Sequence, residues 1–84
     1  MAWRHRRGGI TVIDWIECTD SSRVQAVAYD EEGERILVRF PDGAQWQYHG
    51  CPPSVWEEFT SPQTSKGRFI FEQLNQHQHG PFTD

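Results

Sequence analysis

The chain has 84 residues and a formal net charge of −4, with a hydrophobic content of 36% and an aromatic content of 13%. This length allows one small domain, in which large aromatic rings supply much of the core. The negative charge excludes a broadly basic nucleic-acid surface, although it is compatible with a local basic patch. The longest apolar run is far short of the roughly 20 residues of a membrane span, and no signal peptide is recognisable. We therefore expect a cytoplasmic protein without a membrane association.

The first 18 residues divide into a basic arm and a candidate strand. Residues 1–9 carry Arg4, Arg6 and Arg7, and form either a flexible, solvated terminus or an arm that folds onto RNA, a nucleotide or an acidic partner. Residues 10–18 are rich in β-branched and aromatic side chains, which predicts a strand. Both faces of this strand are partly apolar, as in a strand that is covered on two sides or pairs with a second copy. A homo-oligomer through the N-terminal strand is therefore a candidate assembly.

Three further strands are predicted over residues 24–29, 35–40 and 44–49. The first two are joined by an acidic turn in which Gly33 is available for a positive φ, and the last two by Pro41-Asp42-Gly43. In the last strand, polar residues alternate strictly with alanine and aromatic residues. Short turns between consecutive strands predict an antiparallel meander.

The C-terminal third is predicted to be helical. Pro52 and Pro53 end the last strand, and an apolar face with a spacing of four predicts a helix over 54–59. A second helix, capped by Ser65, is predicted to run through Leu74. Residues 76–84 are polar and indicate a frayed tail. The predicted fold class is α+β, with a single domain over 10–75 in which the meander and the N-terminal strand are covered by two short helices.

The order of these features resembles the KTSC domain, a small module named for its occurrence at the C-terminus of some lysyl-tRNA synthetases and found also in free-standing bacterial and phage proteins. The resemblance covers roughly residues 21–75. It differs from the family pattern at Trp46 and Phe69, where the pattern has tyrosines, and in the N-terminal extension. The matching positions are Ser21-Ser22, Val27-Ala28-Tyr29-Asp30, Ile36, Val38, Phe40, Gly43, Trp46-Gln47-Tyr48, Pro53, Trp56, Phe59, Ser65, Gly67, Phe69 and Leu74. The resemblance implies the fold, no established enzymatic activity, and RNA binding as a suggested role.

Two groups of side chains are candidates for binding. The rings of Tyr29, Trp46 and Tyr48 form either a stacking platform for bases or the core between sheet and helices. A set of arginines and neighbouring polar residues forms either a polar groove that contacts phosphates and base edges or a solvated outer face. That set consists of Arg23, Arg35, Arg39, Gln45, Gln47 and His49.

The remaining candidates are a helix start, a pair of histidines and the two cysteines, and they predict neither catalysis nor metal binding. The segment Ser65-Lys66-Gly67-Arg68 is either an anion site at a helix start or an ordinary helix cap. His77-Gln78-His79 lacks acidic partners, and Cys18 and Cys51 are not in a CxxC arrangement, so we expect unpaired cysteines, no metal and no cofactor. Cys51 has His49 two residues before it, but such neighbours on a strand do not have the geometry of a nucleophile and its base, and no orienting group is recognisable, so we expect no enzyme.

Three functional hypotheses follow. The first is a non-catalytic module that binds RNA or another nucleic acid through Arg39, Trp46, Gln47, Tyr48, Lys66 and Arg68. The second is an oligomeric phage or bacterial protein that binds or sequesters a small nucleotide-like ligand. The third is a protein–protein interaction module.

Overall fold

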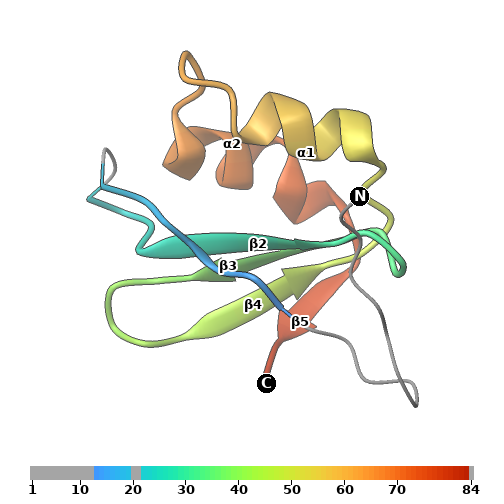
Figure 1. The fold of residues 1–84 in the computed structure, drawn as a ribbon, viewed down its shortest axis with the longest axis horizontal. Helices are drawn as coiled ribbons and strands as arrows, with labels where there is room; N and C mark the ends of the chain where they lie inside the picture. Colours follow the sequence, from blue (N-terminus) through green and yellow to red (C-terminus); the bar gives the residue numbers. More distant parts are fainter. Residues whose placement is uncertain (1–12, 20–21, 84) are drawn as a thin grey trace.

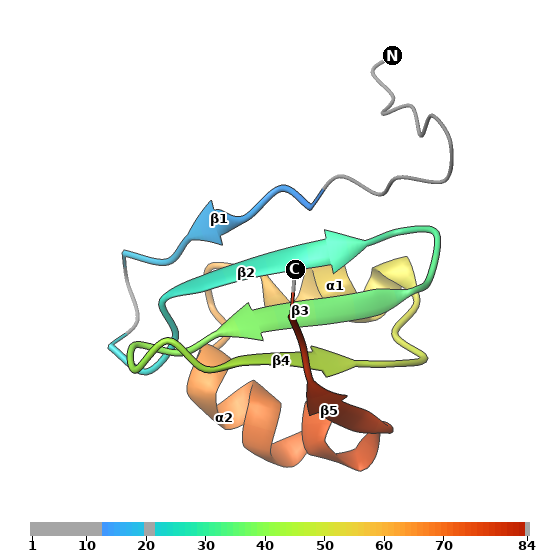
Figure 2. The same cartoon turned by 90° about the horizontal axis from the view of Figure 1, so that it is seen from below.

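The structure, a computed structural model, describes residues 13–19 and 22–83. Within these ranges the chain forms an antiparallel sheet of five strands in the order β1-β2-β3-β4-β5, and its helices lie between β4 and β5 in sequence. The helices cover one face of the sheet (Figure 1), and the end of the chain after β5 crosses the opposite face (Figure 2). The predicted α+β fold, an antiparallel meander covered by two short helices, is confirmed.

The central meander consists of β2 (Ala26–Asp30), β3 (Arg35–Arg39) and β4 (Gln45–Tyr48). In the register of these strands, Val38 lies opposite both Val27 and Trp46. This register places every second residue of the three strands on the same face of the sheet. The alternation in the sequence therefore decides which side chains meet the helices.

The helix-covered face of the sheet carries the hydrophobic core. Valine, isoleucine and tyrosine side chains of the meander pack there against phenylalanine, isoleucine and leucine side chains of the helices. The buried cluster consists of Val24, Val27, Ile36, Val38, Tyr48, Cys51, Phe59, Phe69, Ile70 and Leu74. Because this cluster combines residues from every part of the meander and from all helices, it holds the two layers together.

The helical layer consists of α1 (Pro53–Phe59), α2 (Lys66–Glu72) and the short 3-10 helix η1 (Leu74–Gln76). Pro53 begins α1 because its missing N–H is not needed in the first turn. The rings of Phe59 and Phe69 lie 5.4 Å apart and join the two α-helices over the sheet. In the described ranges, none of the helices is both long and apolar enough to cross a membrane.

The N-terminal strand is shorter than the sequence predicts. Only Ile16 and Glu17 form β1, opposite Val27 and Ala26 of β2, whereas residues 13–15 have no regular structure. The prediction of a strand over 10–18 is therefore wrong for residues 13–15 and for Cys18. The remaining residues of that prediction and the basic arm over 1–9 lie outside the described residues.

The C-terminal segment contains a strand that the sequence analysis did not predict. β5 (His79–Pro81) pairs with β4, with Pro81 opposite Trp46 and His79 opposite Tyr48. The prediction of a frayed tail over 76–84 is wrong for Gln76, which ends η1, and for residues 79–81. The reason is that η1 returns the chain to the edge of β4, where backbone groups are available for pairing.

Candidate functional site

The structure divides the six predicted binding residues among three places. Arg39 and Gln47 lie on the sheet face opposite the helices. Trp46 and Tyr48 lie on the helix-covered face, and Lys66 and Arg68 belong to α2. Since the sheet separates the first pair from the others, these residues do not form one continuous surface.

Trp46 and Tyr48 belong to the core. The Tyr48 side chain is only 3% exposed, and Trp46 is partly buried against the same cluster. Burial raises the pKa of the Tyr48 phenol above its ordinary value, because the charged form is disfavoured away from water. His79 of β5 lies 5.3 Å from the Tyr48 ring and 6.1 Å from the Trp46 ring, measured between centroids. These rings therefore stabilise the sheet edge and are poorly placed to stack on bases.

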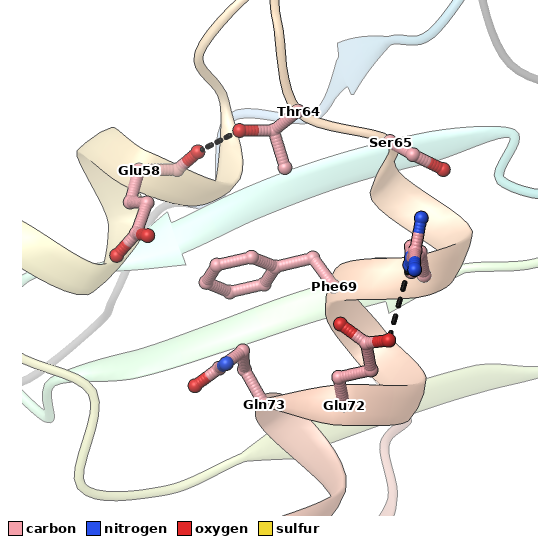
Figure 3. A pocket seen from close by; sticks show the side chains of 7 residues that line it. Glu58, Thr64, Ser65, Phe69, Glu72 and Gln73 are labelled. Atoms are coloured by element: carbon pink, nitrogen blue, oxygen red, sulfur yellow. Dashed lines mark hydrogen bonds and ion pairs between the residues drawn. The ribbon is translucent and has the colours of Figure 1, made fainter.

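The start of α2 lies beside a shallow hollow that contains acidic groups (Figure 3). Arg68 pairs there with Glu72 at 3.0 Å, and the Thr64 hydroxyl donates to the Glu58 carbonyl at 2.7 Å. The carboxylates of Glu58 and Glu72 both line the hollow. Two nearby carboxylates disfavour a phosphate group, so this region is a weaker anion site than the sequence alone indicates.

Gly67 has a packing role at this helix. A Cβ atom at Gly67 would lie 2.8 Å from Cδ of Arg23, so a larger residue at this position would require the arginine stem to shift. This contact places Arg23 next to α2 and away from Arg35 and Arg39. The predicted groove with three arginines is therefore divided, and two of its arginines remain together.

The sheet face opposite the helices carries a layer of polar and aromatic side chains, which we call the polar face. It is formed by the outward-pointing residues of β2, β3 and β4 and by one ring from each terminal segment. Its members are Asp30, Arg35, Arg39, Gln45, Gln47, Trp15 and Phe82. Beneath this layer, Ala26, Ala28 and Leu37 are fully buried. The sheet is thus covered on both sides, by helices on one and by this layer on the other.

Arg35 is fully engaged in structural contacts. Its Nε and Nη2 donate to Asp30 Oδ2 at 2.9 and 2.7 Å, and its Nη1 donates to Gln47 Oε1 at 2.7 Å. Gln47 in turn donates from Nε2 to the carbonyl of Pro81 at 2.8 Å. Asp30 is buried, so its carboxylate needs this cation. Arg35 and Gln47 therefore fix β5 to the meander and have little capacity left for a ligand.

Arg39 is oriented but only partly used. Its Nε donates to Gln45 Oε1 at 2.8 Å, and its guanidinium carbon lies 4.3 Å from the centroid of the Trp15 ring. Within residues 13–19 and 22–83, no hydrogen bond involves the two Nη groups of Arg39. A planar guanidinium that is held at Nε, with two Nη groups remaining, can bind a pair of oxygens or a base edge in a bidentate manner.

Trp15 and Phe82 connect the two arginines. Their rings lie 6.3 Å apart, and Phe82 lies 5.7 Å from the guanidinium carbon of Arg35. Sequence reasoning identified the arginines and glutamines as a polar groove but did not connect either ring with them. The alternation of the N-terminal segment was a signal for Trp15, whereas the position of Phe82 depends on the unpredicted β5.

The described residues show no arrangement that favours metal binding or a reactive thiol. No group of three histidine, cysteine or acidic side chains in these ranges is placed to hold a metal ion. Cys51 is fully buried, and burial raises the pKa of its thiol, so the nucleophilic thiolate is scarce at neutral pH. The Tyr29 hydroxyl donates to the Cys51 carbonyl at 2.6 Å, and its ring stacks on Trp56, so both are structural.

Comparison with known proteins identifies relatives of this chain. The profile of the KTSC domain matches residues 20–77. A protein of Tsukamurella paurometabola is 33% identical over 51 residues, which cover 61% of this chain and 75% of that protein. The crystal structure of a KTSC domain protein from Yersinia pestis is similar in fold, with a TM-score of 0.76 and 23% identity over 86% of this chain and all of that chain.

Proposed function

This chain belongs to the KTSC domain family, and from that premise we propose that it is a non-catalytic, cytoplasmic module that binds single-stranded RNA on the polar face. The observation that carries the proposal is the geometry of Arg39. Its guanidinium is held at Nε by Gln45, and its two Nη groups are available for a ligand. Such a fork matches the oxygens of a phosphodiester and the edge of a guanine.

The charge of the molecule favours a weak, local interaction. A net charge of −4 gives no long-range attraction for a polyanion, so binding depends on the few cations at the site. For single strands, the slope of log K against log salt concentration is about −0.7 for each neutralised phosphate. We therefore expect a shallow salt dependence, equivalent to one or two phosphates.

The test is fluorescence anisotropy of a labelled single-stranded RNA at low and moderate salt. Arg39→Gln should weaken binding about tenfold or more, because a bidentate contact contributes about 1–3 kcal/mol. Arg39→Lys should recover only part of that loss, because it restores the charge but not the fork. The matched control is Arg68→Gln, which removes an exposed arginine on the helical side of the sheet and should leave the affinity unchanged.

Two results would contradict the proposal. One is the absence of binding by the parent protein at low salt. The other is an equal loss in the Arg39 and Arg68 variants, which would indicate attraction without a defined site.

A second candidate function is an oligomeric binder of a nucleotide-like ligand. It is favoured by one observation: β1 lies at an edge of the sheet and its Ile16 side chain is 54% exposed. Exposed apolar edge residues are typical of strands that pair with another chain. Native mass spectrometry tests this alternative, because a multiple of the chain mass with added mass of nucleotide size would support it and a bare monomer would contradict it.

A further inference from the structure

We infer that residues 13–18 form a displaceable strap, in which the Trp15 ring occupies, in the free protein, the position of an unpaired base on Arg39. This inference rests on the proposed function and adds its regulation. It assigns to the site a ligand group, a nucleobase stacked on a guanidinium, in addition to the phosphate contact.

The geometry of the contact carries the first step. The guanidinium carbon of Arg39 lies over the Trp15 ring, 4.3 Å from its centroid, and the Phe82 ring lies 6.3 Å from the Trp15 ring at an interplanar angle of 58°. Unpaired bases stack on guanidinium planes and aromatic rings in the same way. A base can therefore take this same place against Arg39 only when the indole has left.

The second step is that the strap is paired to the sheet through a short ladder. β1 has two residues, both exposed, and beyond it the pairing with β2 continues in the hydrogen bond from the Cys18 amide to the Gln25 carbonyl at 2.9 Å. Segments with short, exposed ladders open locally at low free-energy cost. The strap can therefore separate from β2 while the meander remains folded.

The third step concerns the indole N–H of Trp15. Its Nε1 is buried, and within the part of the chain that the structure describes it has no hydrogen-bond partner. A buried donor without an acceptor is unfavourable, and moving the ring into water removes this penalty. The unpaired indole N–H therefore makes the position of Trp15 on Arg39 less stable than it would be with a hydrogen-bond acceptor nearby.

The C-terminal segment, in contrast to the strap, is anchored by several hydrogen bonds. It can therefore be used as a reference segment that should stay in place. The Phe82 amide donates to the Gln45 carbonyl at 2.9 Å, and the side chain of Gln45 donates back to the Phe82 carbonyl at 3.3 Å. Gln47 adds the bond to Pro81. Because three hydrogen bonds with β4 anchor the backbone of 81–82, we expect Phe82 to remain in place when the strap opens.

Two variants of the full chain test the inference by RNA anisotropy. Trp15→Ala should tighten binding by about tenfold if the open form is about a tenth of the population, since occlusion reduces the apparent affinity by that fraction. Ile16→Pro should also tighten binding, because proline cannot donate to β2 and so weakens the strap without changing the ring. The control is Phe71→Ala, which removes a ring that is 76% exposed on α2 and should have no effect.

The outcomes separate this inference from the proposed function. Weaker binding by Trp15→Ala would make the indole part of the binding surface, which overturns the strap and leaves RNA binding intact. No binding by the parent or by any variant would overturn both. Tighter binding by Phe71→Ala as well would indicate a nonspecific effect of surface rings and would also contradict the strap.

Amide hydrogen exchange of the unmutated protein provides a test that does not depend on the stability of a variant. Addition of single-stranded RNA should decrease the protection of the Cys18 amide and preserve that of the Phe82 amide. Unchanged or increased protection at Cys18 in the bound state would overturn the inference.

Discussion

At the residue scale, Arg35 and Arg39 show how position decides the role of identical side chains. Both are outward-pointing residues at the ends of β3. Arg35 lies opposite the buried Asp30 and pairs with its carboxylate. Arg39 lies opposite Ala26 and contacts the neutral Gln45 side chain and the Trp15 ring. A buried carboxylate requires a compensating cation, so one arginine is structural and the other is available for a ligand.

A residue-scale prediction follows from the raised pKa values of Tyr48 and Cys51. Burial keeps both groups protonated in the folded protein, whereas the unfolded chain releases their protons near the ordinary values of 9.0 for the thiol and 10.0 for the phenol. The unfolded state then binds fewer protons, so the free energy of unfolding decreases as the pH rises above these values. Urea titrations from neutral pH to above pH 10.0 should show this decrease.

Tyr48→Phe is the matched variant for this measurement. It keeps the buried ring and removes the phenol, so its free energy of unfolding should decrease less than that of the parent above pH 10.0. Parallel decreases in the two proteins would show that Tyr48 does not contribute to the alkaline loss.

At the element scale, the two hairpin turns use glycine for different reasons. In the first turn, the sequence makes Gly33 available for the positive φ, but the structure has it at Glu34, with a φ of 52°. Gly33 is instead required because a Cβ atom would lie 2.8 Å from the Asp30 carboxylate, to which its amide donates. In the second turn, Gly43 itself has a φ of 94°, which side chains rarely adopt.

An element-scale prediction compares two glycines that both have open space around them. A Cβ atom at Gly43 or at Gly80 would contact nothing within 4 Å, but only Gly43 of these two has a positive φ. Gly43→Ala should therefore lower the free energy of unfolding by about 1–2 kcal/mol through backbone strain alone. Gly80→Ala should have no destabilising effect. Equal destabilisation in urea titrations would show that strain in the turn is not the cause.

At the scale of the whole molecule, the first and last described segments complete the domain. β1 and β5 extend the meander at its two edges, and Trp15 and Phe82 meet on the polar face. Ala26, Ala28 and Leu37 beneath these rings are fully buried, which indicates that this face is a second packing layer. A small domain gains stability in this way, since covering both faces of a sheet removes more apolar area from water.

A whole-molecule prediction concerns the C-terminal segment. Deletion of residues 79–84 should lower the free energy of unfolding by about 2–3 kcal/mol, because it removes β5 and leaves Gln47 without its Pro81 partner. Deletion of only residues 83–84 is the control and should have little effect on stability. If both deletions were equally tolerated in thermal or urea unfolding, β5 would not be part of the stable fold.

The sequence by itself determined the meander, its turns and the two α-helices within one or two residues at most ends. These features depend on local signals: alternation along a strand, glycine and proline in turns, and a spacing of four on a helix. The same signals identified Arg39 and Gln47 as members of one polar surface, because their separation within the hairpin sets their face.

Only the tertiary structure decided which face of β4 is buried, where β5 pairs, and that Trp15 joins Arg39. From the sequence alone, Trp46 and Tyr48 could form either part of the core or a surface for base stacking. The packing of the helices on their face of the sheet places them in the core. β5 has too few apolar residues to be recognised as a strand, since its stability comes from β4 and from two glutamine side chains. Contacts between residues distant in sequence are chosen by the packing of the whole chain, so local patterns do not encode them.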